Sequence, residues 1–305
     1  SVPQQDFGDY ELIVVVDGSD EGNLQRYREI EAEQPGITFE FMVHRPRGHG
    51  HSYSMNVGAA IAKGRYLCFI DDDDYWTDAG HLSRVYSSID ACDQAVDVHY
   101  SNQRAFHGDG NPYSGPVWLD DLAQRVEERW RVSPDCFRVD ARFMINSAGF
   151  AHLNCTVFRS EFYAEIGGMD ENIRYEDDRD VFIRAVDGAS SILYCTRYVA
   201  RHNIPDASRK QNLSTESTDI ANKLDQLRVF DKAICLCRQP CVIDACRRAK
   251  TYELKHVASI LAAQGRHTGA AHYAREACLG AFNLRWMCYA FYLSLLALLR
   301  PGQKV

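Results

Sequence analysis

Hydrophobic and polar positions along residues 1 to about 200 follow the pattern of strands and helices in alternation. Continuous or alternating apolar runs predict strands, and stretches with a polar face at helical spacing predict the helices between them. The predicted strands cover residues 12–16, 37–43, 66–70 and 96–100, and the predicted helices cover 23–32, 53–62 and 78–89. This order favours an α/β fold with an open, mostly parallel sheet flanked by helices.

The C-terminal part of the chain follows a different pattern. From Asn222 onward strand signals vanish, and apolar residues keep helical spacing. The stretch 258–281 resembles a helical hairpin of the tetratricopeptide kind, with its turn at Gly265. We therefore expect an α/β domain over residues 1–221 and a C-terminal α-helical appendage over 222–305.

One segment of the expected α/β domain lacks a regular pattern. Residues 108–148 are rich in Gly, Pro and charged residues around Trp118 and Trp130. Such composition is typical of loops, because Gly and Pro interrupt both helices and strands. We expect this segment to form an irregular lobe over a binding site.

Composition limits the classes of partner. The chain has 305 residues, 46% of them hydrophobic, and a formal net charge of −8. This hydrophobic fraction provides a sizeable core, and the acidic balance argues against a nucleic-acid partner, which needs a basic face. Eleven scattered cysteines, an odd number, indicate reduced thiols and a cytoplasmic protein rather than a disulfide framework.

One apolar run lies near the C-terminus. Residues 286–299 contain a single polar residue, Ser294, and the run is too short to cross a bilayer unaided. Arg285 and Arg300 flank it, which favours peripheral contact of residues 283–300 with a membrane surface. A core helix or an oligomer contact explains the same run equally well.

The sequence YLCFIDDDDYW joins an apolar strand to four consecutive aspartates. Strand side chains alternate in direction, so Asp71 and Asp73 are expected on one face and Asp72 and Asp74 on the other. Two carboxylates on one face at a strand end hold Mg²⁺ or Mn²⁺, which completes its coordination with water and phosphate oxygens. The alternative is a solvated acidic turn.

A second acidic cluster lies in the sequence RYEDDRDVFIRA. Helical spacing places Asp178 on the face of Val181 and Phe182, where apolar residues point inward. A carboxyl group withdrawn from water has a raised pKa and suits general-base work. Asp180 stands four residues before Arg184, which predicts an ion pair on an exposed face.

The chain carries four motifs in the order ELIVVVDGSDEG, SMNVGAAIAKGRYLCFIDDDDYW, GGMDENIRYEDDRDVFIRA and RYVARHNIP. In this order they resemble family 2 glycosyltransferases, and the likeness covers roughly residues 1–215. The resemblance implies the nucleotide-diphospho-sugar transferase fold, called GT-A. This fold is Rossmann-like, and in such sheets ligands bind beyond the carboxyl ends of the strands.

The resemblance also implies roles for individual residues. Asp178 corresponds to the catalytic base, while Asp73 and His202 correspond to ligands of the divalent cation, Mg²⁺ or Mn²⁺. Nucleotide-sugar contacts are expected from Asp17, Asn56, Asp71 and Asp72. Acceptor contacts are expected from Trp76, Phe150, His152, Asn154 and Asp177.

These roles imply inverting transfer of a sugar from a nucleotide-diphosphate sugar to a hydroxyl of a glycan or lipid-linked acceptor. A nucleotidyltransferase of related fold is one alternative; it needs a Gly-rich basic loop after its first strand, a region that this sequence does not cover. A non-catalytic nucleotide-sugar-binding module is the alternative outside enzymes. His49 and His51, in RGHGHS, are expected to be loop residues rather than ligands.

The resemblance places a first strand and helix before Ser1. The opening SVPQQDFGDYELIVVV matches the end of that helix and the second strand. We therefore expect an N-terminally truncated domain with a gap in the sheet at the place of the first strand. Val16 and Met55 stand where the family commonly has Asp and Arg, so Asp17 reads the nucleotide base only after a one-residue shift of the turn.

Overall fold

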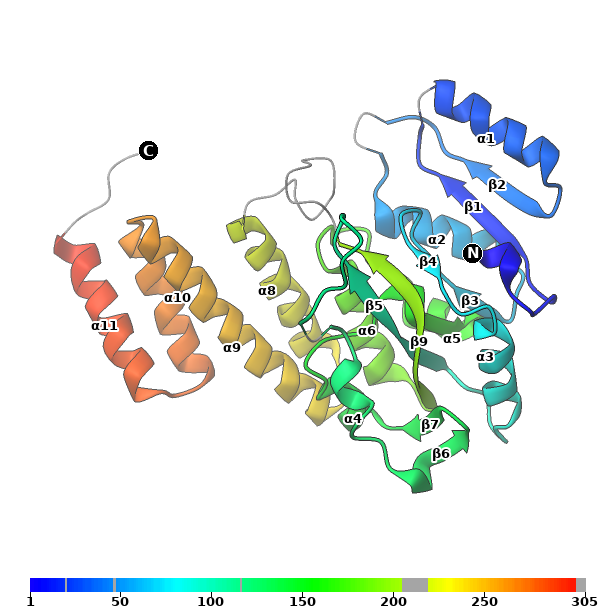
Figure 1. Ribbon diagram of the computed structural model, residues 1–305. Coiled ribbons are helices and arrows are strands. Elements are labelled where there is room, and N and C mark those ends of the chain that lie inside the picture. The colour runs from blue at the N-terminus through cyan, green and yellow to red at the C-terminus, as the bar shows by residue number, and fades with distance from the viewer. Residues whose placement is uncertain (20, 46–47, 116, 205–218, 300–305) are drawn as a thin grey trace. The chain divides into compact units, whose positions relative to one another are not determined.

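The computed structural model describes residues 1–19, 21–45, 48–115, 117–204 and 219–299 (Figure 1). Contacts divide the chain into two units, Ser1–Ser208 and Arg209–Val305, and each is described by itself. The strands of the first unit are β1 (Leu12–Val16), β2 (Ile37–Phe41), β3 (Tyr66–Cys68), β4 (Tyr75–Trp76), β5 (Val98–Phe106), β6 (Arg131–Ser133), β7 (Cys136–Val139), β8 (Thr156–Arg159) and β9 (Ile192–Asn203). Its α-helices are α1 (Glu21–Glu33), α2 (His51–Ile61), α3 (His81–Asp90), α4 (Ala141–Ile145), α5 (Ser160–Glu165) and α6 (Asp177–Gly188), and its 3-10 turns are η1 (Val2–Gln4), η2 (Asp120–Leu122), η3 (Glu128–Trp130) and η4 (Leu153–Cys155). The second unit contains α8 (Asp219–Leu236), α9 (Pro240–Ala263), α10 (His267–Gly280) and α11 (Leu284–Leu299).

The first unit is built on a seven-stranded open sheet with the strand order β3-β8-β5-β9-β7-β6, and β4 pairs with β9. β5 and β9 are parallel, with Val98 opposite Ile192. β8 runs antiparallel to both β3 and β5, so β3, β5 and β9 share one direction. The predicted α/β fold is confirmed, and the sheet is mixed because β7 and β8 run against these strands.

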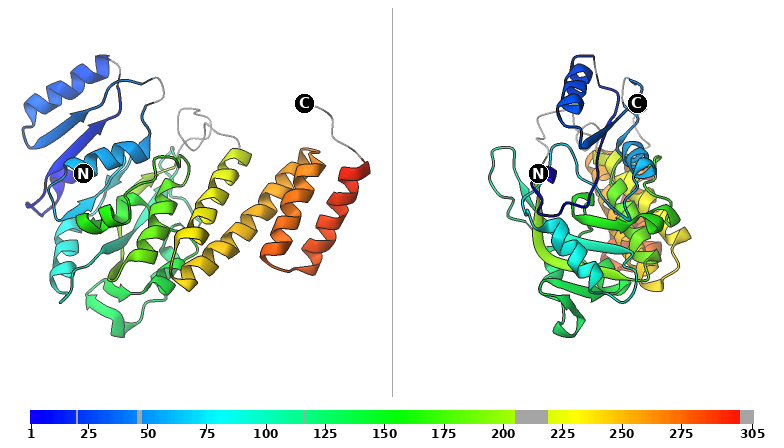
Figure 2. Two further views of the ribbon diagram at one scale, coloured as in Figure 1. Left: turned by 180° about the vertical axis from the view of Figure 1, so that it is seen from behind. Right: turned by 90° about the vertical axis from the view of Figure 1, so that its right-hand side faces the viewer.

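β1 and β2 form a separate parallel sheet, with Leu12 opposite Ile37 and Val16 opposite Phe41. Within the described ranges, no strand pairs with the second edge of β1 or of β3. Figures 1 and 2 show the two sheets as distinct groups of strands. An open sheet edge of the predicted kind is therefore present in the described ranges, whereas the missing first strand stays a prediction.

Helices α3 and α6 cover opposite faces of the sheet at β5. Tyr100 of β5 packs edge-on against Phe182 of α6, with ring centroids 5.5 Å apart. His99, the preceding residue, lines a cavity beside Val85 of α3. Neighbouring side chains of an extended strand point to opposite faces, so the two helices enclose β5 between them. This places β5 at the centre of the core.

Residues 108–148 differ from the irregular lobe that the sequence predicts. They contain β6, β7 and α4, and β7 extends the main sheet by pairing antiparallel with β9. Cys136 and Phe137 of β7 are buried, and Trp130 packs edge-on against Phe143. Strands this short between turns give no clear alternation of apolar residues, which is why the pattern did not predict them.

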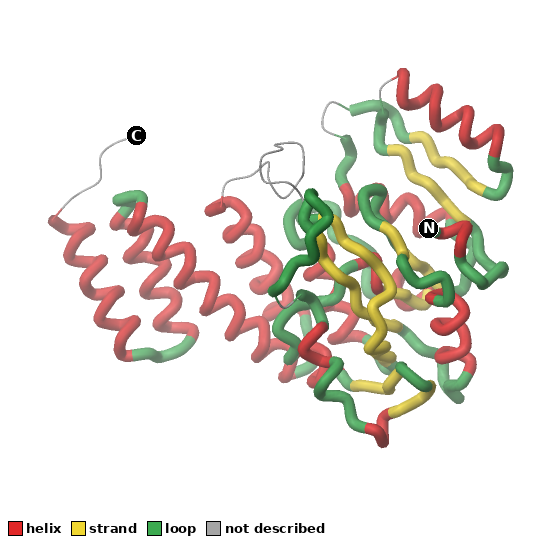
Figure 3. Tube along the Cα trace, viewed as in Figure 1, coloured by secondary structure: helices red, strands yellow, loops and turns green. Residues whose placement is uncertain are grey.

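The second unit consists of helices joined by loops, as Figure 3 shows. α9 and α10 form the predicted hairpin around a turn at Gly265. Their contact is closely packed because Ala270 and Ala274 of α10 are small and lie in one buried cluster with Val257 and Leu261 of α9. Of the helices in the described ranges, none has both the length and the apolar character that crossing a bilayer requires.

Candidate functional site

Acidic and histidine side chains gather where β3 and β9 end in the first unit. The loop after β3 supplies Asp71 and Asp74, and His202 lies next to the last residue of β9. The N-terminal turns of α2 and α6 reach the same place, because His51 of α2 contacts both Asp71 and Asp177 of α6. This is the edge at which open α/β sheets usually bind ligands.

His51 joins the carboxylates of two elements. Its Nδ1 lies 2.8 Å from Oδ2 of Asp177, and its Nε2 lies 3.1 Å from Oδ1 of Asp71. Burial opposes a charge on the ring, but the hydrogen bonds to Asp177 and Asp71 prevail and raise the pKa of His51 to about 11. Burial likewise opposes ionisation of Asp71, and the bond from His51 nevertheless lowers the pKa of that carboxyl group. His51 is thus a cation that stabilises the acidic loop.

His51 lies in the site, although the sequence predicts that it is a loop residue. The residue opens α2 directly after Gly50, the N-terminal cap of the helix. This position at the start of a helix could have indicated a site residue, because the N-terminus of a helix often faces a ligand and its first side chains then lie near that ligand.

Asp177 anchors His51, and the acceptor contact that the sequence predicts for Asp177 stays a prediction. The residue is buried at the start of α6. Its Oδ2 also accepts a hydrogen bond from Oγ of Ser52 at 2.6 Å, and its Oδ1 accepts one from the N–H of Asp178 at 3.1 Å. Because donors within the protein already occupy the carboxylate, its position favours a structural role.

Asp178 is the acidic residue whose surroundings favour a bound proton. It is partly buried in the first turn of α6. Burial, together with the carboxylates of Asp177 and Glu176, raises the pKa of Asp178 to about 8. Its Oδ1 accepts a hydrogen bond from the N–H of Arg179 at 2.8 Å. A carboxyl group with a pKa this close to neutral suits proton transfer.

Asp180 forms the predicted ion pair with Arg184, but the prediction of an exposed face was wrong. The Asp180 side chain is 3% exposed and that of Arg184 is 16% exposed, with Oδ2 2.7 Å from Nη2. Arg184 also donates a hydrogen bond to the carbonyl oxygen of Gly168 at 2.7 Å. The pair therefore ties α6 to the loop that follows α5.

Asp180→Asn is expected to lower the free energy of unfolding by about 3 kcal/mol, because it leaves the buried Arg184 guanidinium without its counter-charge. Urea unfolding followed by circular dichroism measures the change. Glu29→Gln is the matched control, since it removes an exposed pair with Arg26 and is expected to cost less than about 1 kcal/mol. Equal effects of the two substitutions would contradict the buried pair.

The four consecutive aspartates have different surroundings. Asp72 and Asp73 are exposed, whereas the side chain of Asp74 is fully buried. A turn closed by the Asp74 N–H and the Asp71 carbonyl oxygen, at 3.2 Å, replaces the extended strand that the sequence predicts here. The alternation that put Asp71 and Asp73 on one face therefore does not apply.

Among the described residues, Asp74, His152 and His202 form the group suited to a metal ion. One possible ligand atom from each lies within 4.8 Å of the others. His202 belongs to this group as predicted, His152 joins it although the sequence predicts an acceptor contact, and Asp73 is outside it. Oδ2 of Asp74 lies 2.7 Å from Nδ1 of His202. Burial lowers the pKa of His152 to about 4, so its ring is neutral and has a lone pair for a metal.

Trp118 covers the site beside these histidines. Its ring meets those of His202 and His152 edge-on, with centroids 5.1 Å and 5.8 Å apart. The Trp118 backbone is left-handed, with φ 46°. Gly149 permits the close approach of the Trp118 backbone, because a Cβ at Gly149 would come 2.4 Å from the Trp118 carbonyl oxygen. The segment 108–148 thus reaches the site through Trp118.

Comparison with known proteins identifies the family. The sequence profile described as Glycosyl transferase family 2 matches residues 1–167, more than half of the 305-residue chain. The chain belongs to glycosyltransferase family 2. The resemblance from which the residue roles were taken is thereby confirmed.

Curated relatives are also named glycosyltransferases. An uncharacterized glycosyltransferase of Haemophilus influenzae is 21% identical over 241 residues, which cover 75% of this chain and 69% of the relative. A PGL/p-HBAD biosynthesis glycosyltransferase of Mycobacterium bovis is 26% identical over 199 residues, which cover 65% of this chain and 66% of the relative. The chain thus spans roughly two thirds of the length of the curated relatives it matches.

Solved structures of similar fold include S. aureus TarS. The structure of TarS 1-349 matches with a TM-score of 0.59 at 14% identity, over 92% of this chain and 75% of that chain. TarS 1-349 in complex with UDP matches with a TM-score of 0.55 at 15% identity, over 85% and 64% of the two chains. At these identities the likeness shows the fold alone.

In this family 2 glycosyltransferase, Asp17 and Asn56 already have partners within the protein. The Asp17 carboxylate accepts hydrogen bonds from the N–H groups of His49 at 2.8 Å and Gly50 at 3.0 Å. Asn56 donates to the carbonyl oxygen of Met169 at 2.9 Å. Both side chains hold the elements around the N-terminus of α2, and their contacts to a nucleotide sugar stay predictions.

Trp76 and Asn154 are buried, 7% and 1% exposed, which does not favour the acceptor contacts that the sequence predicts. Nε1 of Trp76 donates to the carbonyl oxygen of Asn154 at 2.9 Å, and Oδ1 of Asn154 accepts the N–H of Asp71 at 3.0 Å. Both residues therefore position the aspartate loop of the glycosyltransferase. Phe150 lies beneath the guanidinium of Arg179, 4.5 Å from the ring centroid.

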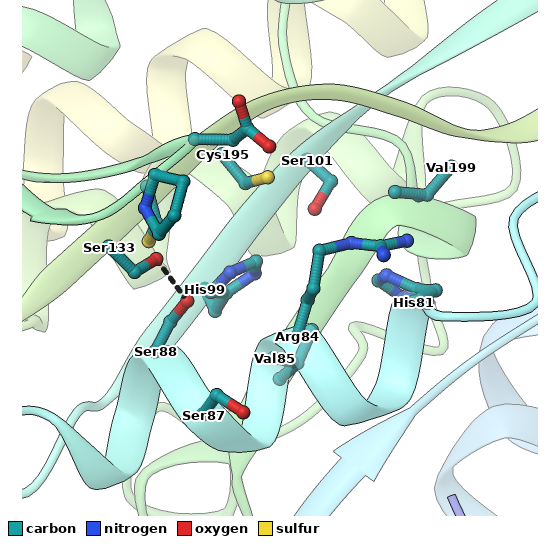
Figure 4. A pocket seen from close by; sticks show the side chains of 13 residues that line it. His81, Arg84, Val85, Ser87, Ser88, His99, Ser101, Ser133, Cys195 and Val199 are labelled. Carbon is teal, nitrogen blue, oxygen red and sulfur yellow. Dashed lines mark hydrogen bonds between the residues drawn. The ribbon is translucent and has the colours of Figure 1, made fainter. Parts of the chain in front are cut away.

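A separate cavity of about 150 Å³ lies between α3 and the sheet (Figure 4). His81 and His99 line it together with Ser88 and Ser133, whose hydroxyl oxygens are 2.8 Å apart. Burial lowers the pKa of His81 to about 3 and that of His99 to about 4, so both rings are neutral. The lining contains no residue of the acidic site, so this cavity belongs to the core of the glycosyltransferase.

Proposed function

We propose that this chain transfers a sugar from a nucleotide-diphosphate sugar to a hydroxyl of a glycan or lipid-linked acceptor, with inversion at the anomeric carbon. One observation carries the proposal. Asp178, with a pKa of about 8, follows Asp177 directly, and His51 connects Asp177 to the acidic loop after β3. A single displacement needs a base that takes the proton of the acceptor hydroxyl and, close to it, a loop that binds the donor.

In the proposed step the ionised Asp178 accepts the proton of the acceptor hydroxyl while that oxygen bonds to the anomeric carbon. The bond from this carbon to the diphosphate breaks in the same displacement, and the diphosphate leaves with the electron pair. The cationic His51 holds Asp71 and Asp177 in place and provides fixed positive charge near the departing group. Asp17, Asn56, Asp71 and Asp72 are the proposed donor contacts. UDP-sugars are the first donors to test, since TarS 1-349 was solved with UDP.

Asp74, His152 and His202 would hold a divalent cation, and their spacing within 4.8 Å supports this set. One carboxylate with two imidazoles suits Mn²⁺ better than Mg²⁺, which favours oxygen ligands. When bound, the cation offsets the charge of the departing diphosphate. Asp73 is the alternative ligand, because it is the residue that corresponds to the family motif.

Release of UDP from nucleotide sugars tests the proposed function. The full chain is incubated with a panel of UDP-sugars, with and without Mn²⁺, and free UDP is measured. The proposal predicts Mn²⁺-dependent release that increases with a suitable hydroxyl acceptor. Binding without release would indicate a non-catalytic module, and release of inorganic pyrophosphate from UTP and a sugar phosphate would indicate a nucleotidyltransferase.

We also propose that α11 lies on the cytoplasmic surface of a membrane. Its Leu284, Phe291, Leu295 and Leu298 recur on one helical face, with exposed fractions between 43% and 79%. An exposed apolar face of this kind is unusual on a soluble monomer and is typical of helices that lie in a membrane interface. Arg300, expected to flank the face, lies outside the described residues.

The pair Phe291→Glu and Leu298→Glu is expected to reduce co-sedimentation with phosphatidylglycerol vesicles by at least about tenfold, because two charges would enter the apolar layer. Leu236→Glu on α8 is the matched control, since Leu236 is 66% exposed and lies outside α11. Unchanged sedimentation of the double variant would instead favour an oligomer contact for α11.

A further inference from the structure

A groove of about 520 Å³ lies over β4, β5 and β9, and arginine and aromatic side chains line it. Arg104 of β5 and Arg201 of β9 stand opposite each other in the sheet register. Like charges directly opposite on neighbouring strands repel and destabilise the pair. An anion between the two guanidinium groups would remove this repulsion.

Two carboxylates near the groove, Asp135 and Asp78, pair with a third arginine, and a further one, Asp120, interacts electrostatically with Arg104 and Tyr198. Arg197 lies 3.0 Å from Oδ2 of Asp135 and 3.6 Å from Oδ2 of Asp78. Neither Arg104 nor Arg201 has a carboxylate within 4.0 Å in the part of the chain that the structure describes. Within the described residues, no ion pair offsets the positive charge of Arg201, and Asp120 offsets that of Arg104 only from a longer distance.

Aromatic rings hold both guanidinium groups in place. Arg104 lies over Tyr198 at 4.7 Å, and Arg201 lies over Phe106 at 4.0 Å. Nε of Arg201 donates to Oδ1 of Asn203 at 3.0 Å. A stacked guanidinium keeps the N–H groups at its edge available, and its planar fork matches the two oxygens of a phosphate or carboxylate. The groove is thus preorganised for an anion.

The same groove presents aromatic surface to solvent. Tyr75 is 41% exposed and Tyr198 is 39% exposed. Tyr75 stands opposite Arg201 in the pairing of β4 with β9. Exposed rings beside charged forks provide apolar contact area for the face of a sugar ring. The lining therefore suits a ligand with both sugar rings and negative groups.

The groove lies close to the transfer site along two strands. Tyr75 directly follows Asp74, and Arg201 directly precedes His202. Consecutive side chains of a strand point to opposite faces, so the arginine pair and His202 lie on the two sides of β9 near its end. An extended polymer that passes the end of β9 can contact both sides, whereas a monosaccharide cannot.

We propose that this groove binds an acceptor glycan whose repeating units carry phosphate or carboxylate groups. The inference rests on the proposed sugar transfer to a glycan and adds the charge and the length of the acceptor. The chain as a whole has a net charge of −8, which repels a polyanion at long range. Binding of such a glycan therefore depends on the local pair Arg104 and Arg201.

The double variant R104Q/R201Q tests this inference by fluorescence anisotropy at physiological salt. The probes are labelled carboxymethyl dextran, phosphorylated dextran and neutral dextran of equal length. Wild-type protein is expected to bind the two charged dextrans, and the double variant at least about tenfold more weakly. R104K/R201K keeps the charges without the planar forks and is expected to bind with intermediate affinity. R138Q, an exposed arginine on β7, is the matched control.

Undiminished binding of charged dextrans by R104Q/R201Q would overturn the inference, as would equal binding of neutral dextran by the wild type. If the double variant loses binding to phosphatidylglycerol vesicles but keeps dextran binding, the arginines serve a lipid surface and the inference is also wrong. R104K/R201K is expected to melt at the wild-type temperature, and R104Q/R201Q at the same or a higher temperature, because the repulsion between the two arginines is gone. Binding of UDP in the presence of Mn²⁺ is measured separately. If the wild type binds charged dextrans but no UDP, the proposed donor site is wrong and the glycan groove is still supported.

Discussion

Asp178→Asn is expected to lower kcat by about a hundredfold to ten-thousandfold, because the amide keeps the size of the carboxyl group but accepts no proton at neutral pH. The dissociation constant of the nucleotide sugar is expected to stay near the wild-type value, since Asp178 is outside the group formed by Asp74, His152 and His202. Turnover and donor binding are measured side by side. Asp187→Asn, further along α6, is the matched control. Wild-type turnover in Asp178→Asn would exclude Asp178 as the base.

The raised pKa of Asp178 adds a pH dependence to this prediction. The ionised carboxylate is the base, so wild-type kcat is expected to increase with pH and to level off above a pH of about 8. The residual kcat of Asp178→Asn is expected to show no such increase with pH, because an amide does not ionise in this range. A wild-type kcat that stays constant between about pH 6 and about pH 9 would contradict Asp178 as the base.

The same pKa predicts a gain in stability for Asp178→Asn. The folded-state pKa lies above the ordinary value of 3.8, so between these two values the folded protein holds a proton that the unfolded chain has released. Wild-type stability therefore falls as pH increases through this window, and the asparagine variant avoids the loss. Its melting temperature is expected to exceed that of the wild type at pH 8 and to match it near pH 4.

Asp74→Asn is expected to weaken Mn²⁺-dependent binding of UDP on the order of a hundredfold, because it removes the charged oxygen ligand of the three-residue group. Asp73→Asn is the matched control, since Asp73 lies exposed on the same loop and outside this group. Calorimetric titration of UDP with and without Mn²⁺ measures both variants. His202→Gln is expected to reproduce the loss, which distinguishes a missing ligand from a disturbed loop.

If Asp73→Asn instead loses the dependence on Mn²⁺, the ligand is the residue that the family motif implies. The turn over residues 71–74 would then change when the donor binds, and the contact between Asp74 and His202 would serve to position that histidine. Wild-type Mn²⁺-dependent affinity in both variants would contradict a cation site on this loop.

Local patterns in the sequence predicted much of the fold. The strand over residues 12–16 has the predicted bounds, and the strands that begin at Ile37 and Tyr66 start where the pattern placed them. Buried strands and surface helices leave periodic signals that depend only on near neighbours. The order of the motifs then predicted the family, which the family match over residues 1–167 confirms.

The parts that the sequence did not predict depend on contacts between distant residues. His51 is separated from Asp177 by 126 positions, and no local pattern reports such a pairing. Asp180 has the spacing of a surface ion pair, and only the packing of α6 against the loop after α5 buries it. Asp74 rather than Asp73 lies in the group that could hold a metal ion, because a turn, rather than an extended strand, carries the aspartates; Asp73 as a ligand stays a prediction.

The stereochemistry of the sugar product tests the central claim most directly. An α-linked UDP-sugar is incubated with Mn²⁺ and the full chain at pH 8, the cation is removed with a chelator, and the anomeric proton of the first product is recorded by NMR. A single displacement with Asp178 as the base predicts a β-configured product and predicts its loss in Asp178→Asn. An α-configured product, or one formed equally by Asp178→Asn, would contradict the account.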